Sequence, residues 1–280
     1  MVIQNGRWQT LKFNRKSPHG WYLIDKDEEE VLLPNKYLPE KIIVGQDTNV
    51  FVYRDSEERL VATYLKPLIE LNTFAILDIV ATSNFGAFAN WGMEKHLFIP
   101  FKEQHQRLKE GDYSIVYMYL DNVTDRLVGS ARVNRWLNPD TPLYKKGQKV
   151  SVMVYHQNEV GYQVIIEQEF RGIIYTNEVF EPLNIGDRLQ AYVRQIREGG
   201  LVDLSYTPLG RSKISSYQER ILRELNSNGG FIALNDKADP DEIQQHLQMS
   251  KKSYKEAIGG LYRDRMIDFY RNGIRLIAEE

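Results

Sequence analysis

Hydrophobic and polar residues alternate with a period of two over much of residues 8–203, which is the pattern of half-buried β-strands. The clearest runs are residues 50–53, 115–119 and 189–193, and they are rich in β-branched and aromatic side chains. Shorter runs surround each of them, at residues 8–13, 19–22, 31–33 and 60–62, then 74–80, 85–88, 97–99 and 127–129, then 150–155, 160–163, 172–174 and 201–203. The pattern predicts three groups of about five short strands.

A repeated glycine spacing supports the same division into three. The chain carries one pair of glycines twenty-five residues apart in each group, namely Gly20 and Gly45, Gly86 and Gly111, Gly161 and Gly186. A period that recurs together with its flanking hydrophobic runs indicates three copies of one structural unit. Five short strands that close on themselves form a small Greek-key barrel, so we predict three tandem OB-fold barrels.

From Ser212 onward the hydrophobic period changes to between three and four, which predicts helices. We expect a helix over residues 215–227, a short strand over 231–234, a helix capped by Asp239, a helix capped by Ser250, and a hairpin that turns at Asn272-Gly273. This order is typical of an α+β winged helix-turn-helix domain. The predicted fold class is therefore mainly β and multidomain, with barrels at 1–69, 70–142 and 143–210 and a winged helix at 211–280.

The composition is that of a globular chain that contains no disulfides. Of its 280 residues, 42% are hydrophobic and 26% charged, and this length suits several domains. The absence of cysteine excludes disulfides and thiolate metal sites and agrees with a reducing cytoplasm. The first residues lack the basic and apolar blocks of a signal peptide, and no apolar stretch is long enough to cross a bilayer. We expect a cytoplasmic protein without membrane contact.

The charge balance limits how the chain can bind nucleic acid. It carries 36 basic and 38 acidic residues, for a formal net charge of −2. This balance argues against a strongly basic coat. Any nucleic-acid contact must therefore come from local patches and from base stacking.

The middle repeat contains the most specific motif, Phe85-Gly86-Ala87-Phe88. Residues three apart in a regular strand point to opposite faces, but a glycine between them permits a bulge that brings both rings to one surface. Two exposed rings form a platform on which successive bases of a single strand can stack. The alternative is that both rings belong to the hydrophobic core. The motif resembles that of the S1-type RNA-binding domain, which favours the platform.

The other repeats carry different residues at the corresponding positions. The first has His19 and Tyr22, which can stack on bases, whereas Val160 and Gln163 in the third stack poorly. Further candidates for RNA binding are Arg132, as a phosphate contact after the last strand of the second repeat, and Arg171, Tyr175 and Arg194 in the third repeat. Arg171 and Arg194 are alternatively surface ion-pair partners.

The third helix of the C-terminal domain is a candidate recognition helix, because such helices often enter a major groove. Basic residues outnumber acidic ones along it, and the candidate contacts are Lys251, Lys252, Lys255 and Arg263. The alternative is a solvated helix face in a domain that docks on protein. Gly259-Gly260 within this helix are unfavourable unless another helix packs closely there.

Four stretches, residues 90–101, 125–128, 178–183 and 249–262, are similar to the conserved virulence factor B family, also called YitL-like. The resemblance extends over nearly the whole chain. It implies three S1-type domains followed by a winged helix, and an RNA-binding protein linked to regulation of gene expression in bacteria. On this basis we expect single-stranded RNA as the partner.

No feature of the sequence predicts catalysis. The five histidines show no pair at the spacing of a helical metal site, and no P-loop, nucleophile elbow or dinucleotide fingerprint is present. We therefore expect no enzyme activity, no cofactor and no metal. Two other functions stay open: a winged-helix regulator that binds DNA, and a non-catalytic scaffold that docks on the ribosome or on a ribonuclease.

Overall fold

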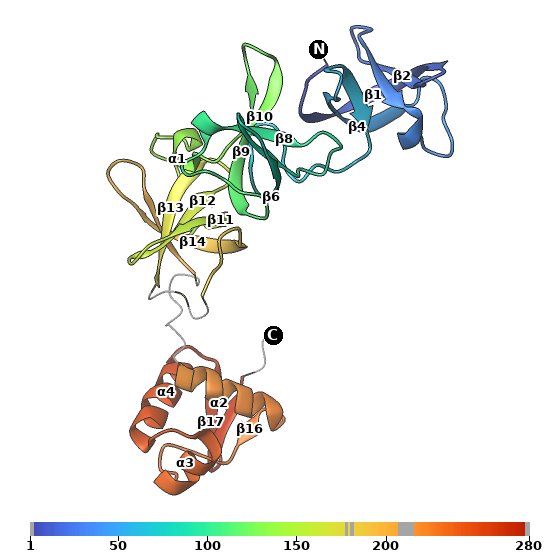
Figure 1. Ribbon diagram of the computed structural model, residues 1–280. Coiled ribbons are helices and arrows are strands. Elements are labelled where there is room, and N and C mark those ends of the chain that lie inside the picture. The colour runs from blue at the N-terminus through green and yellow to red at the C-terminus, as the bar shows by residue number, and fades with distance from the viewer. Residues whose placement is uncertain (1–2, 177–178, 180–181, 207–215, 278–280) are drawn as a thin grey trace. The chain divides into compact units, whose positions relative to one another are not determined.

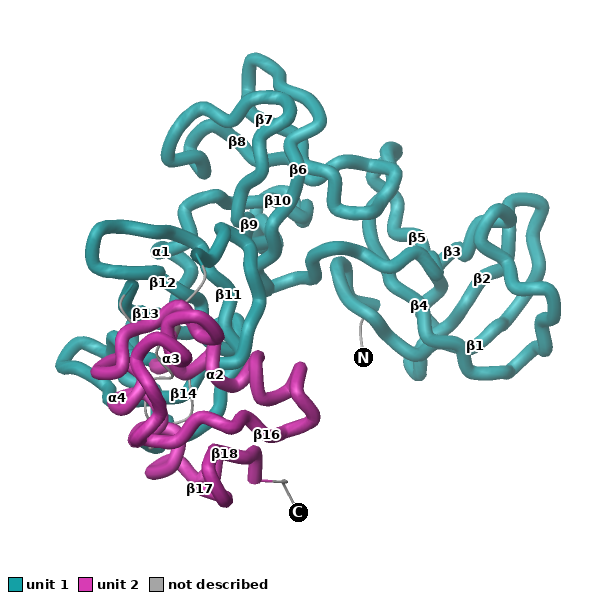
Figure 2. The backbone as a smooth tube through the Cα atoms, turned by 90° about the horizontal axis from the view of Figure 1, so that it is seen from below, with its two compact units in different colours: residues 1–204 teal, residues 205–280 magenta. Residues whose placement is uncertain are grey.

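The computed structural model describes residues 3–176, 179, 182–206 and 216–277. The chain divides into two compact units, Met1–Leu204 and Ser205–Glu280. Figures 1 and 2 show that the first unit is built almost entirely of strands and that the second carries most of the helices. Among the described residues, no helix combines the length and apolar character needed to cross a membrane.

Three closed barrels of five strands form the first unit, which confirms the predicted fold. The strands are β1 (Arg7–Ser17), β2 (Gly20–Ile24), β3 (Glu30–Pro34), β4 (Asp47–Arg54) and β5 (Leu60–Thr63) in the first barrel; β6 (Phe74–Thr82), β7 (Gly86–Ala89), β8 (Leu97–Pro100), β9 (Tyr113–Asp121) and β10 (Arg126–Ser130) in the second; and β11 (Lys149–Gln157), β12 (Gly161–Ile166), β13 (Phe170–Tyr175), β14 (Arg188–Ile196) and β15 (Val202–Ser205) in the third. Short helices follow some strands, namely η1 (Asn35–Tyr37), η2 (Phe101–Glu103) and α1 (Val133–Trp136). In each barrel the third and fifth strands pair in parallel and close the sheet.

The repeated glycines hold two equivalent places in every barrel. Gly20, Gly86 and Gly161 each open the second strand, opposite Pro34, Pro100 and Tyr175 of the third strand. A Cβ atom at these glycines would lie only 2.1, 2.3 and 2.4 Å from a carbonyl oxygen of the third strand. The second glycines, Gly45, Gly111 and Gly186, have φ angles of +82°, +87° and +97° before the fourth strand. The repeat therefore marks a close strand approach and a left-handed turn.

Neighbouring barrels of the first unit share hydrophobic packing. Phe51 and Tyr53 of β4 are buried in the same cluster as Trp91 and Met93 of the second barrel. The Trp91 ring centroid lies 6.0 Å from those of both Phe51 and Tyr53. Phe74 of β6 similarly belongs to one cluster with side chains of the third barrel. The first and second barrels are therefore held in a defined relation by buried aromatic rings.

The second unit is a winged helix domain with its own core. Its elements are α2 (Ser216–Ser227), β16 (Phe231–Ile232), α3 (Pro240–Leu247), α4 (Lys251–Arg263), β17 (Ile267–Tyr270) and β18 (Gly273–Leu276), and its sheet has the order β16-β18-β17. Both expected helix caps are present, because Asp239 accepts a hydrogen bond from the Asp241 N–H and Ser250 accepts one from the Ser253 N–H.

The hairpin turn and the double glycine of α4 can both be compared with the expectations from the sequence. Tyr270 pairs with Gly273, so the central turn residues are Arg271 and Asn272, and the expected Asn272-Gly273 turn is wrong by one residue. Gly273 is required for the approach of β18 to β16, because a Cβ there would collide with the carbonyl oxygen of Ile232 in β16.

The double glycine of α4 agrees in part with the expected close helix packing. A Cβ on Gly260 would meet the Gln218 side chain of α2, whereas a Cβ on Gly259 would meet nothing within 4 Å.

The expected domain limits, 1–69, 70–142, 143–210 and 211–280, remain predictions. The boundary between residues 210 and 211 lies outside the described residues, as do residues 178, 180 and 181 of the stretch 178–183.

Candidate nucleic-acid interface

The rings of the middle motif reach the surface of the second barrel. Phe85 lies in the bend before β7 and is 76% exposed, while Phe88 within β7 is half-buried. Phe88 pairs with Phe98 of β8, and the two ring centroids are 5.3 Å apart at an angle of 41°. Both rings of the motif are therefore available on one side of the barrel.

The expected mechanism for this arrangement is wrong in one respect. The irregularity in strand register lies in β6, between Ile79 and Ala81, and not at Gly86 in β7. Phe85 instead shares a surface with Phe88 because it precedes the strand, where its backbone N–H donates to the Ser83 hydroxyl at 3.2 Å. Gly86 serves the close approach of β7 to β8.

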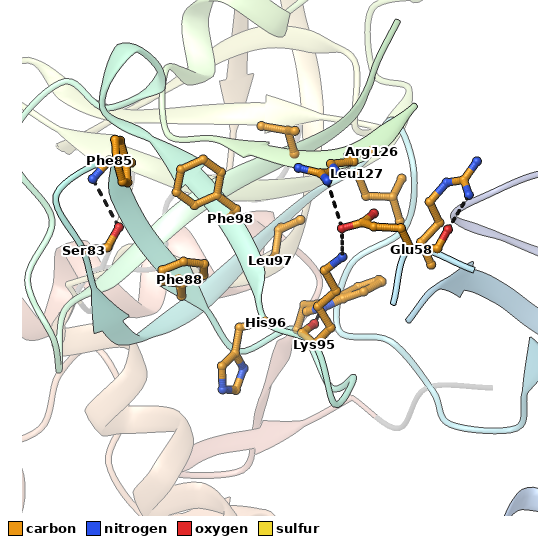
Figure 3. A pocket seen from close by; sticks show the side chains of 13 residues that line it. Glu58, Ser83, Phe85, Phe88, Lys95, His96, Leu97, Phe98, Arg126 and Leu127 are labelled. Atoms are coloured by element: carbon orange, nitrogen blue, oxygen red, sulfur yellow. Dashed lines mark hydrogen bonds and ion pairs between the residues drawn. The ribbon is translucent and has the colours of Figure 1, made fainter. Parts of the chain in front are cut away.

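A pocket of about 700 Å³ lies beside these rings, a size typical of ligand sites. Its apolar wall is formed by Phe85, Phe88, Trp91, Leu97, Phe98, Leu127 and Val128. Its polar lining includes Arg54, Glu58, Ser83, Lys95, His96 and Arg126. Figure 3 shows the motif rings on one side of the pocket and the charged group around Glu58 on the other. Such a pocket offers flat apolar faces together with charged donors and acceptors.

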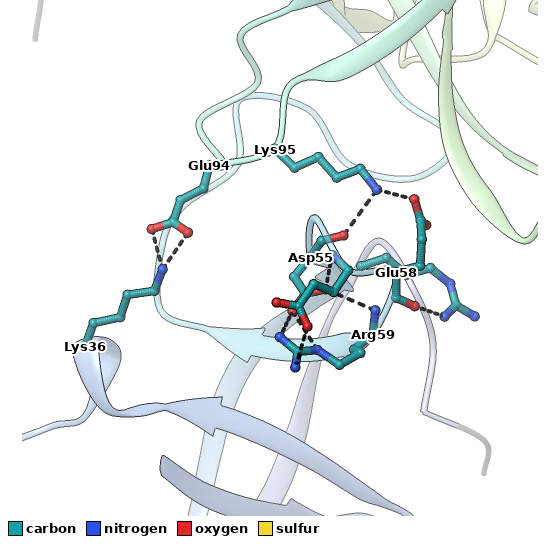
Figure 4. A network of polar contacts seen from close by, with 8 residues as sticks. Lys36, Asp55, Glu58, Arg59, Glu94 and Lys95 are labelled. Carbon is teal, nitrogen blue, oxygen red and sulfur yellow. Dashed lines mark hydrogen bonds and ion pairs between the residues drawn. The ribbon is translucent and has the colours of Figure 1, made fainter. Parts of the chain in front are cut away.

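The charged group joins the first barrel to the second. The Lys95 ammonium donates to Glu58 Oε1 at 2.7 Å and to the Asp55 carbonyl oxygen at 3.2 Å, as Figure 4 shows. The Arg126 guanidinium lies 3.2 Å from the same Glu58 oxygen. The hydrogen bond from Lys95 holds the pKa of the Glu58 carboxyl below its usual range, so Glu58 is ionised at neutral pH.

The corresponding face of the first barrel has a cavity of about 580 Å³, whose lining includes His19 and Tyr22. His19 is exposed and Tyr22 half-buried. The Arg15 guanidinium lies over the Tyr22 ring, 3.9 Å from its centroid, and pairs with Glu30. The structure therefore brings both candidates of the first repeat into one cavity.

The structure does not bring Arg132 and the three candidates of the third repeat together in one site. Arg132 lies outside the lining of the Phe85 pocket, and its Nε donates to the Lys102 carbonyl oxygen at 2.7 Å. The Tyr175 hydroxyl donates to the buried Asp203 carboxylate at 3.3 Å. Arg171 is exposed at the other end of β13 from Tyr175, a separation of about 13 Å along the strand. Arg194 is exposed on β14.

The candidate lysines of the winged helix lie on α4. Lys252, Lys255 and Arg263 are exposed, while Lys251 is half-buried and its ammonium donates to the Lys237 carbonyl oxygen at 3.4 Å. Arg263 is eight residues beyond Lys255, which is about 12 Å along a helix. The three lysines therefore form one group at the start of α4 and Arg263 stands apart.

Sequence reasoning missed most of the pocket lining. Arg54 and Glu58 belong to the site only because the first barrel packs on the second, whereas Trp91 and Arg126 come from the second barrel itself. Phe98 could have been found from the repeat. Gly86 and Pro100 correspond to Gly20 and Pro34 of the first repeat, and pairing Gly86 with Pro100 places Phe88 opposite Phe98.

Comparisons with known proteins agree with this architecture. Residues 5–65 match the family model described as an S1 domain, and residues 219–276 match the CvfB-like winged helix domain. The Bacillus subtilis protein YitL is 26% identical over 97% of this chain and 93% of its own length. Conserved virulence factor B of Staphylococcus epidermidis is 25% identical over 83% of this chain and 80% of its own. Over most of its length the chain is therefore similar to the proteins named YitL and conserved virulence factor B, and its C-terminal part matches the winged helix model of that type.

One solved structure is similar over the whole length. It is described as a multidomain protein with nucleic acid binding domains from Streptococcus pneumoniae, it is 24% identical, it has a TM-score of 0.42, and the match covers 96% of this chain and 97% of that one. The matches to the S1 and winged helix models support nucleic acid binding. Among the described residues, no group of three or more metal-binding side chains of the histidine, aspartate or glutamate type comes together.

Proposed function

We propose that this protein binds single-stranded RNA by stacking bases on Phe85 and Phe88, and that it regulates gene expression after transcription in the bacterial cytoplasm. The observation that carries the proposal is the 76% exposure of the Phe85 ring beside the half-buried Phe88 ring in one pocket. Contiguous exposed apolar surface with a polar rim is typical of a binding site. A nucleobase is a flat partner of suitable size.

Stacking supplies most of the affinity in this proposal. Each stacked base contributes about 1–3 kcal/mol, whereas a net charge of −2 provides little general attraction for phosphates. The cavity around Tyr22 and the lysines of α4 add weak contacts to the same chain. Linked weak sites raise the overall affinity through effective concentration. In this account the protein acts by binding and performs no catalysis.

The test is the affinity of a labelled oligoribonucleotide for the wild type and for the double variant Phe85→Ala, Phe88→Ala. Loss of two stacking contacts, each about 1–3 kcal/mol, predicts an affinity at least about thirtyfold lower. Tyr113→Ala is the matched control, because Tyr113 is 73% exposed on β9 of the same barrel but outside the pocket. An unchanged affinity in the double variant would remove the platform from the account.

A second function is favoured by one observation, the exposure of Lys252 and Lys255 at the start of α4. A helix-turn-helix places such residues near phosphates or bases in a major groove. This function predicts that the chain binds duplex DNA and that Lys252→Ala with Lys255→Ala abolishes this binding. Equal affinity of the wild type and this variant for duplex DNA contradicts it.

A further inference from the structure

Lys95 lines both ring-bearing cavities, the one around Phe85 and Phe88 and the one around His19 and Tyr22. We propose that one RNA strand crosses the first and second barrels, and that the Lys95 ammonium binds its phosphate between the two ring surfaces. This inference rests on the proposed RNA binding and adds the path of the strand and a phosphate contact. It makes the first two barrels one binding surface.

The barrels are fixed to each other by reciprocal ion pairs. Arg54 of the first barrel pairs with Asp125 in the β9–β10 turn of the second. Arg126 of the second barrel pairs with Glu58 in the β4–β5 turn of the first. Each barrel thus presents a turn carboxylate to an arginine of the other. Together with the buried Trp91 contacts, these pairs keep the two cavities in a constant relation.

The backbone and side chain of Lys95 are both positioned. The Trp91 indole N–H donates to the Lys95 carbonyl oxygen. The ammonium gives one hydrogen bond to Glu58 and one to the Asp55 carbonyl oxygen. An ammonium has three N–H donors, so these contacts within the described residues leave one for a phosphate oxygen. The side chain is 34% exposed, which keeps it within reach of a ligand.

The charge favours an anion on the Phe85 side of Lys95. There the pocket is lined by the cations Arg54, Lys95 and Arg126 and by one carboxylate, Glu58. The Tyr22 cavity has four carboxylates and three cations in its lining and adds no such attraction. Glu58 adopts a left-handed backbone conformation with φ of 63°, which costs a side-chain-bearing residue free energy. The third barrel has Gly199 and Gly200 with positive φ in the corresponding turn. The carboxylate that orients Lys95 is thus held at a conformational cost.

Two substitutions separate a phosphate contact from a merely structural ion pair. Lys95→Ala removes the ammonium, whereas Glu58→Gln breaks the same ion pair but keeps the ammonium. If Lys95 binds phosphate, Lys95→Ala lowers the affinity for an oligoribonucleotide of about 12 nucleotides by about tenfold, and the logarithmic salt dependence becomes shallower by about 0.7. Glu58→Gln keeps a hydrogen-bond acceptor for the Lys95 ammonium and removes one negative charge, so it lowers the affinity by less than Lys95→Ala does.

Controls keep the test decisive. Lys12→Ala is the control and should leave the affinity unchanged, because Lys12 is ion-paired with Asp47 but lines neither cavity. Lys95→Arg keeps the charge and should retain most of the affinity if folding is intact, as checked by circular dichroism. An affinity of Lys95→Ala equal to the wild type overturns the proposal. So does an equal loss in Glu58→Gln and Lys95→Ala, because the lysine would then act only through the ion pair.

The path of the strand has its own test. Tyr22→Ala should weaken binding of a strand of about 12 nucleotides and leave binding of about 4 nucleotides unchanged, because the short strand occupies the second barrel alone. No effect of Tyr22→Ala at either length overturns the crossing path. The variant with Phe85→Ala and Phe88→Ala distinguishes the two claims: if it weakens both lengths while Lys95→Ala and Tyr22→Ala do not, RNA binding stands and the shared path fails.

Discussion

Replacing Gly86 with alanine tests the strand approach that every barrel repeats. The new Cβ would lie 2.3 Å from the Ile99 carbonyl oxygen and 2.8 Å from the Pro100 Cα. An ordinary contact needs about 3.5 Å, so β7 and β8 must separate by about 1 Å. These two groups are backbone atoms, and no rotamer change relieves their clashes; the Phe98 ring, 2.8 Å from the new Cβ, must also move.

The expected cost follows from this geometry. Overpacking of this kind costs about 1–3 kcal/mol, and we place Gly86→Ala at the upper end because the backbone itself must move. Alanine also restricts the unfolded chain, which offsets about 0.4–1 kcal/mol and leaves a net loss of about 2 kcal/mol. Gly111→Ala is the matched comparison, since its φ is +87° and its Cβ would meet nothing within 4 Å. That left-handed strain costs about 1–2 kcal/mol, which the same offset brings below about 1.5 kcal/mol.

Urea unfolding followed by tryptophan fluorescence measures both variants. The four tryptophans, Trp8, Trp21, Trp91 and Trp136, lie in or beside the first two barrels, so the signal reports on the region that is changed. With a slope of about 2 kcal/mol per molar urea, Gly86→Ala should lower the midpoint by about 1 M. A midpoint equal to the wild type, or a larger loss for Gly111→Ala, would refute the reasoning. Since β7 carries Phe88, Gly86→Ala should also weaken binding of the oligoribonucleotide.

Three further outcomes are expected. Trp91→Ala should lower the free energy of unfolding by about 3–5 kcal/mol, because Trp91 is 3% exposed, and a urea midpoint near that of the wild type contradicts the shared core. In α4, Gly259→Ala should stabilise the second unit by about 0.5–1 kcal/mol while Gly260→Ala, which forces Gln218 aside, destabilises it; thermal melting followed by circular dichroism ranks the two variants. The pKa of Glu58 is lowered by Lys95, so its contribution to stability is present above about pH 4.3 and is lost as the pH falls through the lower folded-state pKa. The difference in urea midpoint between wild type and Glu58→Gln should therefore shrink in acid, and a constant difference contradicts the assignment.

The barrels could be predicted from sequence because the glycine at the start of each second strand is required by the backbone. Gly20, Gly86 and Gly161 must lack a side chain where the second strand meets the third, so the spacing survives although the neighbouring residues differ. The helix starts at Asp239 and Ser250 were equally predictable, since a cap depends on residues next to it. The hairpin turn was misplaced because Gly273 is needed by a strand distant in sequence, β16, and not by the turn itself.

The site was only half predictable for a related reason. Phe85 and Phe88 form a local motif, and the exposure of Phe85 agrees with it. Glu58 lies on a turn of a different barrel, and its place beside Lys95 results from the packing of one barrel on another. Residue patterns within one repeat carry no signal for such a contact.

The aromatic packing of Phe51 and Tyr53 around Trp91 has a practical consequence for anyone who divides this chain into fragments. A cut between the first two barrels would expose an apolar surface on each fragment, and such fragments would aggregate or self-associate. A fragment that ends near Leu204 keeps these surfaces covered, and the remainder from Ser205 retains its own interior.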